Sequence, residues 1–204
     1  MVTGKAGTVM RTRNAIKRAI KWFFLAATLP LYGLFLAICI VSRSDNCFAS
    51  FSQFLSLIPG KIGVYFRAAF YHMACPDTSD EISIGFLTLL SHRDTSIASG
   101  VYIGPQCNIG MCAISKNTLI GSGVHVLSGS KQHNFDDPNR PIQDQNGKFE
   151  KIYIGTDCWL GNGSIIMASV SDRSIIGAGS VIVTQTKMNS INGGNPAKII
   201  RYRS

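Results

Sequence analysis

The residues best suited to chemistry lie in a polar segment of the second half of the chain. Regular spacing breaks off between residues 126 and 154, and the sequence GSKQHNFDDPNRPIQDQNGKFEK there carries His133, Asp136 and Asp137. Long excursions from a regular scaffold are usually functional or disordered. Polar residues would also suit a loop that only needs solvation, but histidine is a poor choice for that and titrates near neutral pH. We therefore predict an active-site loop over 129–153.

The other histidines and the cysteines do not predict a metal site. His125 ends a regular unit, where it either contacts an acceptor or cofactor or is simply an exposed corner residue, and His92 precedes the first clear unit. A zinc site of this kind needs three converging histidines. His92, His125 and His133 do not share a phase of the six-residue repeat, so they are not expected to converge. The six cysteines form no C-x-x-C pair. We expect Cys107 and Cys158 to fill tight corners in a reducing compartment.

A six-residue spacing of aliphatic residues must position this loop. A period near six fits neither a helix nor an alternating strand. It predicts a triangular coil whose flat sides point aliphatic residues inward, with about three sides per turn and a core completed by stacking. The spacing shrinks to five after Ile109 and to four after Ile166, so shortened or bulged sides are expected there. The inward positions are Ile97, Ile103, Ile109, Ile114, Ile120, Val126, Ile154, Leu160, Ile166, Val170, Ile176 and Ile182.

The N-terminal part of the chain is apolar and basic. The 20 residues from Trp22 to Val41 carry no charge, and as a helix they would extend roughly 30 Å, the thickness of a bilayer core. No acid precedes Asp45, and the net charge of +9 is concentrated before the apolar run. Cations that adjoin an apolar segment indicate binding to anionic lipid and not to nucleic acid. They also predict that the N-terminus lies on the cytoplasmic side. These cations are Lys5, Arg11, Arg13, Lys17, Arg18 and Lys21.

The orientation of this apolar segment decides on which side of a membrane the repeats lie. A single crossing with a cytoplasmic N-terminus would export the repeats. Pro30 and Gly33 allow a kinked span or a hairpin, and we expect a re-entrant segment that turns at Pro30. The following stretch FASFSQFLSLIP, residues 48–59, is too short to span a membrane. It is either an interfacial helix or a cap over the first coil.

Three motifs follow the repeats: IGTDCWLGNGSIIMASV at 154–170, IIGAGSVIVT at 175–184 and NGGNPAKIIR at 192–201. With the repeats and the His-bearing loop, they make residues 82–204 resemble the hexapeptide-repeat acyltransferases, which have a left-handed parallel β-helix. This group includes galactoside, serine and xenobiotic O-acetyltransferases. The stretches LIPGKIGVYFRAAFY and SIGFLTLLSH look like a membrane-associated branch linked to exopolysaccharide or capsule biosynthesis.

This resemblance implies transfer of an acetyl group from acetyl-CoA to a hydroxyl, with no metal. It implies a homotrimer with active sites between neighbouring β-helices and His133 as general base. The hydroxyl needs such a base because its own pKa lies far above 7, and general-base help is worth roughly 10² to 10⁴ in rate. Asp136 or Asp137 could orient the imidazole ring.

The resemblance also implies a binding site for acetyl-CoA. The family holds the pantetheine arm against the Trp-x-Gly and Gly-Ala-Gly-Ser coils and places cations near the CoA phosphates. Lysine replaces the commoner arginine at the first of these cationic positions, and Trp159 either packs beside the acceptor or covers a coil edge. The matching residues are Trp159, Gly161, Asn162, Ala178, Thr184, Lys198 and Arg201.

The resulting expectation is a mainly β protein with an N-terminal helical membrane-associated segment. We expect an O-acetyltransferase on the cytoplasmic face that modifies a sugar, as a lipid-linked saccharide or polysaccharide precursor, and binds membrane lipids but no nucleic acid. The alternatives are a non-catalytic scaffold in a membrane polysaccharide assembly, or an acetyltransferase for a small acceptor such as serine or a xenobiotic. The expected parts are 1–60 with the membrane segment 22–41 and the interfacial helix 48–59, a connecting or cap segment 61–81, the β-helix 82–190 and a CoA-proximal tail 191–204.

Overall fold

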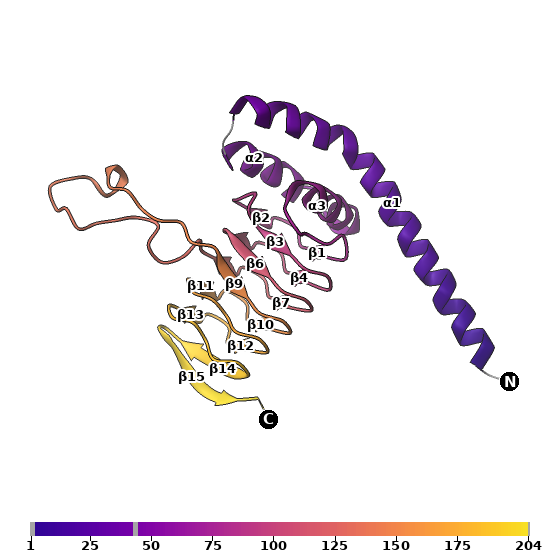
Figure 1. The fold of residues 1–204 in the computed structure, drawn as a ribbon. Coiled ribbons are helices and arrows are strands. Elements are labelled where there is room, and N and C mark those ends of the chain that lie inside the picture. The colour runs from indigo at the N-terminus through magenta and orange to yellow at the C-terminus, as the bar shows by residue number, and fades with distance from the viewer. Residues whose placement is uncertain (1–2, 43–44, 204) are drawn as a thin grey trace.

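The computed structural model describes residues 3–42 and 45–203, in which three helices precede a stack of short strands (Figure 1). Lys5 and Arg11, two of the predicted N-terminal cations, lie outside the residues whose side chains are described. The helices are α1 (Thr3–Ser42), α2 (Asp45–Ser56) and α3 (Gly60–Ala74), and η1 (Ile142–Asp144) is a short 3-10 helix. The strands are β1 (Ser83–Ile84), β2 (Leu89–Leu90), β3 (Ser96–Ile97), β4 (Tyr102–Ile103), β5 (Asn108–Ile109), β6 (Cys112–Ile114), β7 (Leu119–Ile120), β8 (His125–Val126), β9 (Ile152–Ile154), β10 (Trp159–Leu160), β11 (Ile165–Ile166), β12 (Ile175–Ile176), β13 (Val181–Ile182), β14 (Ser190–Gly194) and β15 (Ala197–Tyr202).

Successive strands belong to three different sheets, so the chain coils around a triangular prism. We call the sheets the A face (β1-β4-β7-β10-β12-β14-β15), the B face (β13-β11-β8-β5-β2) and the C face (β3-β6-β9). Each strand pairs in parallel with the strand one coil away, as β4 does with β7, and only the final hairpin β14–β15 is antiparallel among the described pairs. The predicted parallel β-helix is confirmed.

The core is a continuous column of aliphatic side chains inside the prism. On the A face, Ile103, Ile120 and Leu160 are register partners and are completely buried. The outward neighbour of each, such as Tyr102 beside Ile103, remains exposed. Cys107 and Cys158 are buried at the corners as predicted, and their thiols donate to the carbonyls of Gly121 at 3.0 Å and Ser171 at 3.2 Å.

The irregular spacing concentrates at one corner of the prism. From the A to the B face, and from the C to the A face, inward residues are always six apart, as in Ile84 to Leu90 and Ile97 to Ile103. From the B to the C face the interval is seven after Leu90, five after Ile109, 28 after Val126 and four after Ile166. This B-to-C corner therefore tolerates insertions that the other two corners do not contain.

Helix α2 caps the open first coil of the prism. The Leu87 N–H donates to the Ser56 carbonyl at 3.0 Å, and the Leu90 N–H donates to the Ser52 hydroxyl at 2.8 Å. Ser52 in turn hydrogen-bonds the buried Tyr71 hydroxyl of α3 at 2.7 Å. These contacts close the first coil, because they satisfy backbone groups that would otherwise end the sheets unpaired.

Arg67 of α3 is fully buried and ties the cap to the coil. Its Nη1 donates to the carbonyls of Leu55 and Ile58 at the end of α2, and its Nε donates to the carbonyl of Ile84 in β1, all at 2.9 Å. Burial lowers the pKa of the guanidinium. Because these donors pair with backbone carbonyls in and just after the last turn of α2 and in β1, the cation is held by backbone dipoles instead of a carboxylate.

Helix α1 continues through Pro30, so the turn expected there is wrong. Proline removes one helical hydrogen bond, which bends a helix without reversing it, and α1 bends in its C-terminal part while staying one helix (Figure 1). Its inner side packs on the cap: Phe24 stacks on Tyr65 with ring centroids 5.0 Å apart, and Phe35 packs edge-on against Phe70 at 5.3 Å. By length and composition, its Arg13–Cys39 part could cross a membrane.

Replacing Arg67 by methionine should destabilise the cap and the first coil together. The change removes three hydrogen bonds and leaves the carbonyls of Ile58 and Ile84 without their Arg67 donors, and we expect the free energy of unfolding to fall by about 3 kcal/mol. Urea unfolding followed by near-ultraviolet circular dichroism in detergent micelles measures this. Lys61→Met on the exposed side of α3 is the matched control; equal stability of the two variants would contradict the role of Arg67.

Candidate active site

The segment between β8 and β9 leaves the prism at the B-to-C corner and returns to it as a long hairpin. Backbone hydrogen bonds join its two limbs: Glu150 N–H to Ser128 at 2.9 Å, Lys148 N–H to Lys131 at 2.7 Å, and Asn134 N–H to Asn146 at 3.0 Å. A Cβ on Gly147 would lie 1.7 Å from the Gln132 carbonyl oxygen, so the two limbs can approach this closely only at a glycine.

His133 lies on the outgoing limb of this hairpin and is exposed. The two predicted carboxylates lie further toward the tip. The Asp137 side chain accepts from the Asn139 N–H at 3.0 Å, and the Asp137 carbonyl accepts from the Gln145 amide at 2.8 Å, so Asp137 shapes the tip. In the described loop, no hydrogen bond connects Asp136 or Asp137 to His133, and either carboxylate would have to move to orient the ring.

The root of the hairpin is fixed to the cap and the first coil. Lys151 pairs with Asp94 at 2.7 Å, and the ring of Phe149 lies 5.3 Å from that of His92. His92 Nδ1 is in turn 3.0 Å from a carboxylate oxygen of Asp45 at the start of α2. Sequence reasoning missed these contacts because the partners lie far apart in the chain and follow no spacing rule.

Gly161, Asn162 and Ala178 come together at the A-to-B corner. The Gly179 N–H donates to the Asn162 carbonyl at 2.9 Å, and the Asn162 side-chain oxygen accepts from the Ser122 N–H at 3.0 Å, which links three successive coils. A Cβ on Gly161 would lie 2.5 Å from the Ala178 nitrogen. Trp159, exposed on the A face, leads directly into this corner column of Gly161, Asn162 and Ala178.

The remaining predicted cofactor residues lie at other places in the fold. Thr184 is exposed beyond β13, at the B-to-C corner, so a whole face separates it from the corner column. Lys198 and Arg201 are exposed in β15, where Lys198 is the register partner of Gly193 and Arg201 that of Ile191. The final hairpin thus presents both cations at the end of the A face.

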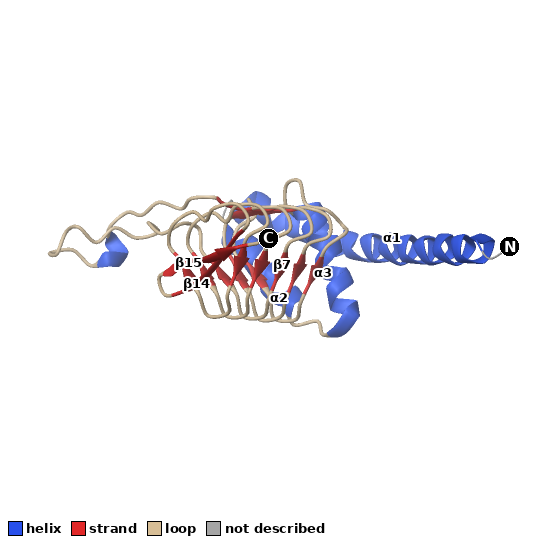
Figure 2. Ribbon diagram, turned by 90° about the horizontal axis from the view of Figure 1, so that it is seen from below, coloured by secondary structure: helices blue, strands red, loops and turns tan. Residues whose placement is uncertain are grey.

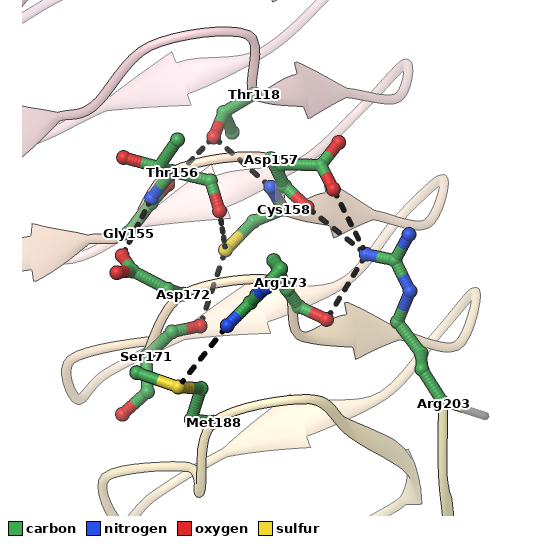
Figure 3. A network of polar contacts seen from close by, with 10 residues as sticks. All are labelled: Thr118, Gly155, Thr156, Asp157, Cys158, Ser171, Asp172, Arg173, Met188 and Arg203. Atoms are coloured by element: carbon green, nitrogen blue, oxygen red, sulfur yellow. Dashed lines mark hydrogen bonds and ion pairs between the residues drawn. The ribbon is translucent and has the colours of Figure 1, made fainter.

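A third C-terminal cation, Arg203, fastens the chain end to the C-to-A corner (Figure 3). Its Nη1 donates to the Asp157 carboxylate at 3.2 Å and to the Arg173 carbonyl at 3.2 Å. Asp172 lies in the same network and accepts from the Thr156 N–H at 2.8 Å. Sequence reasoning did not single out Arg203, and its contacts with two coils give it a structural role.

His125 and Cys112 belong to strands of the prism and not to the projecting hairpin. His125 is exposed on the B face between its register partners Asn108 and Ile165. Cys112 is completely buried, which raises the pKa of its thiol to about 12. Across residues 3–42 and 45–203, no three histidine, cysteine or acidic side chains gather in a way that could hold a metal ion.

Several curated proteins are similar in sequence, although no protein-family model matches. A probable macrolide acetyltransferase from Lysinibacillus sphaericus is 31% identical over 113 residues, which cover 50% of this chain and 63% of that protein. The putative lipopolysaccharide biosynthesis O-acetyl transferase WbbJ from Escherichia coli is 30% identical over 95 residues, 43% of this chain and 48% of that protein. The chain thus spans less than two thirds of either relative.

Solved structures share the fold. A maltose O-acetyltransferase from Clostridium difficile superposes with a TM-score of 0.68 at 17% identity, over 77% of this chain and 85% of that one. The hexapeptide-repeat acetyltransferase VCA0836 from Vibrio cholerae gives 0.65 at 20% identity, over 78% and 92%; a further structure of VCA0836 is a complex with acetyl-CoA. With the observed six-residue coil, these similarities show that the chain shares the fold of the hexapeptide-repeat acetyltransferases.

Proposed function

We propose that the protein is an acetyl-CoA-dependent O-acetyltransferase that modifies a sugar hydroxyl at a membrane surface. The observation that carries this proposal is the histidine-bearing hairpin at residues 129–151, the one long insertion in an otherwise tightly spaced coil. The chain is similar to a lipopolysaccharide biosynthesis O-acetyl transferase and shares the fold of a maltose O-acetyltransferase, which supports a saccharide acceptor.

In this proposal His133 removes the proton of the acceptor hydroxyl as its oxygen attacks the thioester carbonyl of acetyl-CoA. The acetyl group passes to the oxygen, and CoA leaves as the thiol after taking up a proton. A neutral imidazole suits the first step because its ordinary pKa lies near 6.5. The exposed hairpin lets the ring reach an acceptor that a buried histidine could not.

The corner column is the proposed seat of the pantetheine arm. Gly161 in the column, and Gly177 and Gly179 beside Ala178, carry no side chain, so an extended chain can lie along successive coils with little in the way. Lys198 and Arg201 in β15 are exposed cations at the same end of the stack, and in this proposal they meet the CoA phosphates. Lysine at the first position offers a point charge in place of a bidentate fork.

We propose a homotrimer because one copy does not assemble the site by itself. The hairpin and the free half of α1 project to opposite sides of the prism (Figure 2), and the hairpin leaves from the corner one face away from the corner column. Tyr102, Leu119 and Trp159 form an exposed ladder on the A face, in register with one another. A second copy that packs on Leu119 and Trp159 of this ladder would bring its own His133 to the corner column.

We further propose that α1 lies in the cytoplasmic leaflet instead of crossing the bilayer. Its inner side is fixed along the cap, and Lys21 at the start of the apolar run is paired with Asp80 and Glu81 of the first coil. An upright span would draw these charged groups into the bilayer, at high cost. From Trp22 to Ile38 the outer side is apolar, with Trp22, Leu29 and Leu34 exposed, which suits a helix in the plane of the interface.

His133→Ala should abolish transfer and leave acetyl-CoA binding intact. Loss of the general base should reduce kcat by about 10² or more, measured as CoA thiol release with a saccharide acceptor, while calorimetry gives an unchanged Kd for acetyl-CoA. The control His125→Ala replaces an exposed histidine of the B face and should retain turnover. Unchanged turnover in His133→Ala would remove this mechanism, and a wild-type protein without acetyl-CoA binding would favour the scaffold.

Leu119→Glu should convert trimers to monomers, because a carboxylate in the centre of an apolar contact loses its hydration without gaining a partner. Light scattering after size exclusion in detergent measures the mass of the assembly. Tyr153→Glu places the same charge on the exposed C face and should leave the mass unchanged. A monomeric wild type, or a trimeric Leu119→Glu variant, would contradict this interface.

The double variant Leu29→Glu/Leu34→Glu should be released from membranes, since two charges on the outer side of α1 oppose its insertion. Flotation with phosphatidylglycerol-containing vesicles measures the bound fraction, and Tyr153→Glu again serves as the control. Protease protection in cells provides the second measurement. A C-terminus outside the cytoplasm would show that α1 crosses the bilayer.

A further inference from the structure

Two adjoining cavities lie where the free half of α1 leaves the body of the molecule, between α1, α3 and the first coils. The inner cavity is about 260 Å³ in volume and the outer about 440 Å³, and Lys21, Leu25 and Asp80 line both. The inner cavity also contains Phe24, Tyr65, Glu81, Ser83 and Tyr102. The outer cavity also contains Arg18, Trp22 and His72. Neither cavity includes a residue of the candidate active site.

The chemistry of the lining changes in order along the two cavities. At the outer end, Trp22 is 67% exposed and belongs to the apolar outer side of α1. Arg18, one helical turn before Trp22, lines the same cavity. In the middle, Lys21 pairs with Asp80 at 3.5 Å and with Glu81. At the inner end, Glu81 and Ser83 line the same cavity as the rings of Tyr65 and Tyr102. The order is apolar, cationic, then hydroxyl-binding and aromatic.

We propose that these cavities bind the phosphate and the first sugar of a lipid-linked saccharide. The inference rests on the proposed function and names the chemical class of its acceptor. The lipid chain would follow the outer side of α1, and the phosphate would meet Arg18. The sugar hydroxyls would donate to the carboxylates of Asp80 and Glu81, while the sugar ring would pack on Tyr102.

The charge balance of the lining separates this ligand from simpler anions. Arg18 and Lys21 face Asp80 and Glu81, so the cavities carry two positive and two negative side chains. A free phosphate would meet as much repulsion as attraction there. A single phosphate attached to a neutral sugar places its charge at the cationic end and its hydroxyls at the acidic end, which matches both.

The cavities also open on the face of the prism that the proposed chemistry uses. Tyr102 is the register partner of Leu119, and Leu119 is that of Trp159, which leads into the corner column. A saccharide held at Tyr102 therefore begins on the A face, whose edge toward the B face carries the proposed acetyl-CoA seat. The binding site would fix the lipid-proximal end of the acceptor, two coils above that seat.

The test measures binding of a polyprenyl-phosphate-linked N-acetylglucosamine to the full chain in detergent micelles by native mass spectrometry. Arg18→Gln and Tyr102→Ala remove one charge-assisted contact and one aromatic wall, and each should weaken binding about tenfold. Lys17→Gln and Tyr153→Ala are matched controls outside the cavities and should bind as wild type. Against polyprenyl phosphate without the sugar, only Arg18→Gln should lose affinity.

Two results would overturn the inference. One is that both cavity variants bind the glycolipid like wild type; the other is that phosphatidylglycerol or inorganic phosphate competes with it at equal concentration, which would indicate a general anion site. Acetyl-CoA binding is measured on the same samples. A wild type that binds the glycolipid but not acetyl-CoA contradicts the proposed function alone, whereas one that binds acetyl-CoA without selecting the glycolipid contradicts only this inference.

Discussion

The guanidinium of Arg67 joins three parts of the molecule that would otherwise be separate. It holds the carbonyl ends of α2 against the first strand of the A face, from a helix that also carries the aromatic seat of α1. A β-helix needs such an end cap because its first coil exposes unpaired backbone groups and an open core. Here the cap is also the surface on which the apolar helix α1 lies, so closing the coil and holding α1 depend on the same contacts.

The six-residue spacing allowed the coil and its core to be predicted, because inward residues recur at that interval on two of the three corners. Ile97, Ile103 and Ile109 were recognisable for this reason, and each is completely buried. The same periodicity located the hairpin with His133 as the place where it fails. The periodicity did not show that all intervals other than six residues lie at the B-to-C corner. Which face a residue belongs to becomes clear only when the coils are stacked.

Contacts between distant segments lay beyond sequence reasoning. Lys151 with Asp94, His92 with Asp45, and Arg203 with Asp157 each join residues at least 46 positions apart, and no motif marks them. Pro30 gave a misleading signal because the loss of one helical hydrogen bond is too small an effect to turn a helix that packs on a cap. Sequence order also did not show that the predicted cofactor residues lie at different places in the fold. Thr184 follows the corner column in the sequence but lies at the B-to-C corner.

In the proposed function, the cap holds the β-helix, the apolar helix α1 and the His133 hairpin of the transferase in fixed relation. The most direct test is a cryo-electron microscopy structure of the full chain in lipid nanodiscs with acetyl-CoA. The account predicts α1 flat on one leaflet and packed on α3, the pantetheine arm beside Asn162 and Ala178, and His133 of a neighbouring copy at the thioester. An upright α1 detached from the cap, or acetyl-CoA bound away from this column, would contradict it.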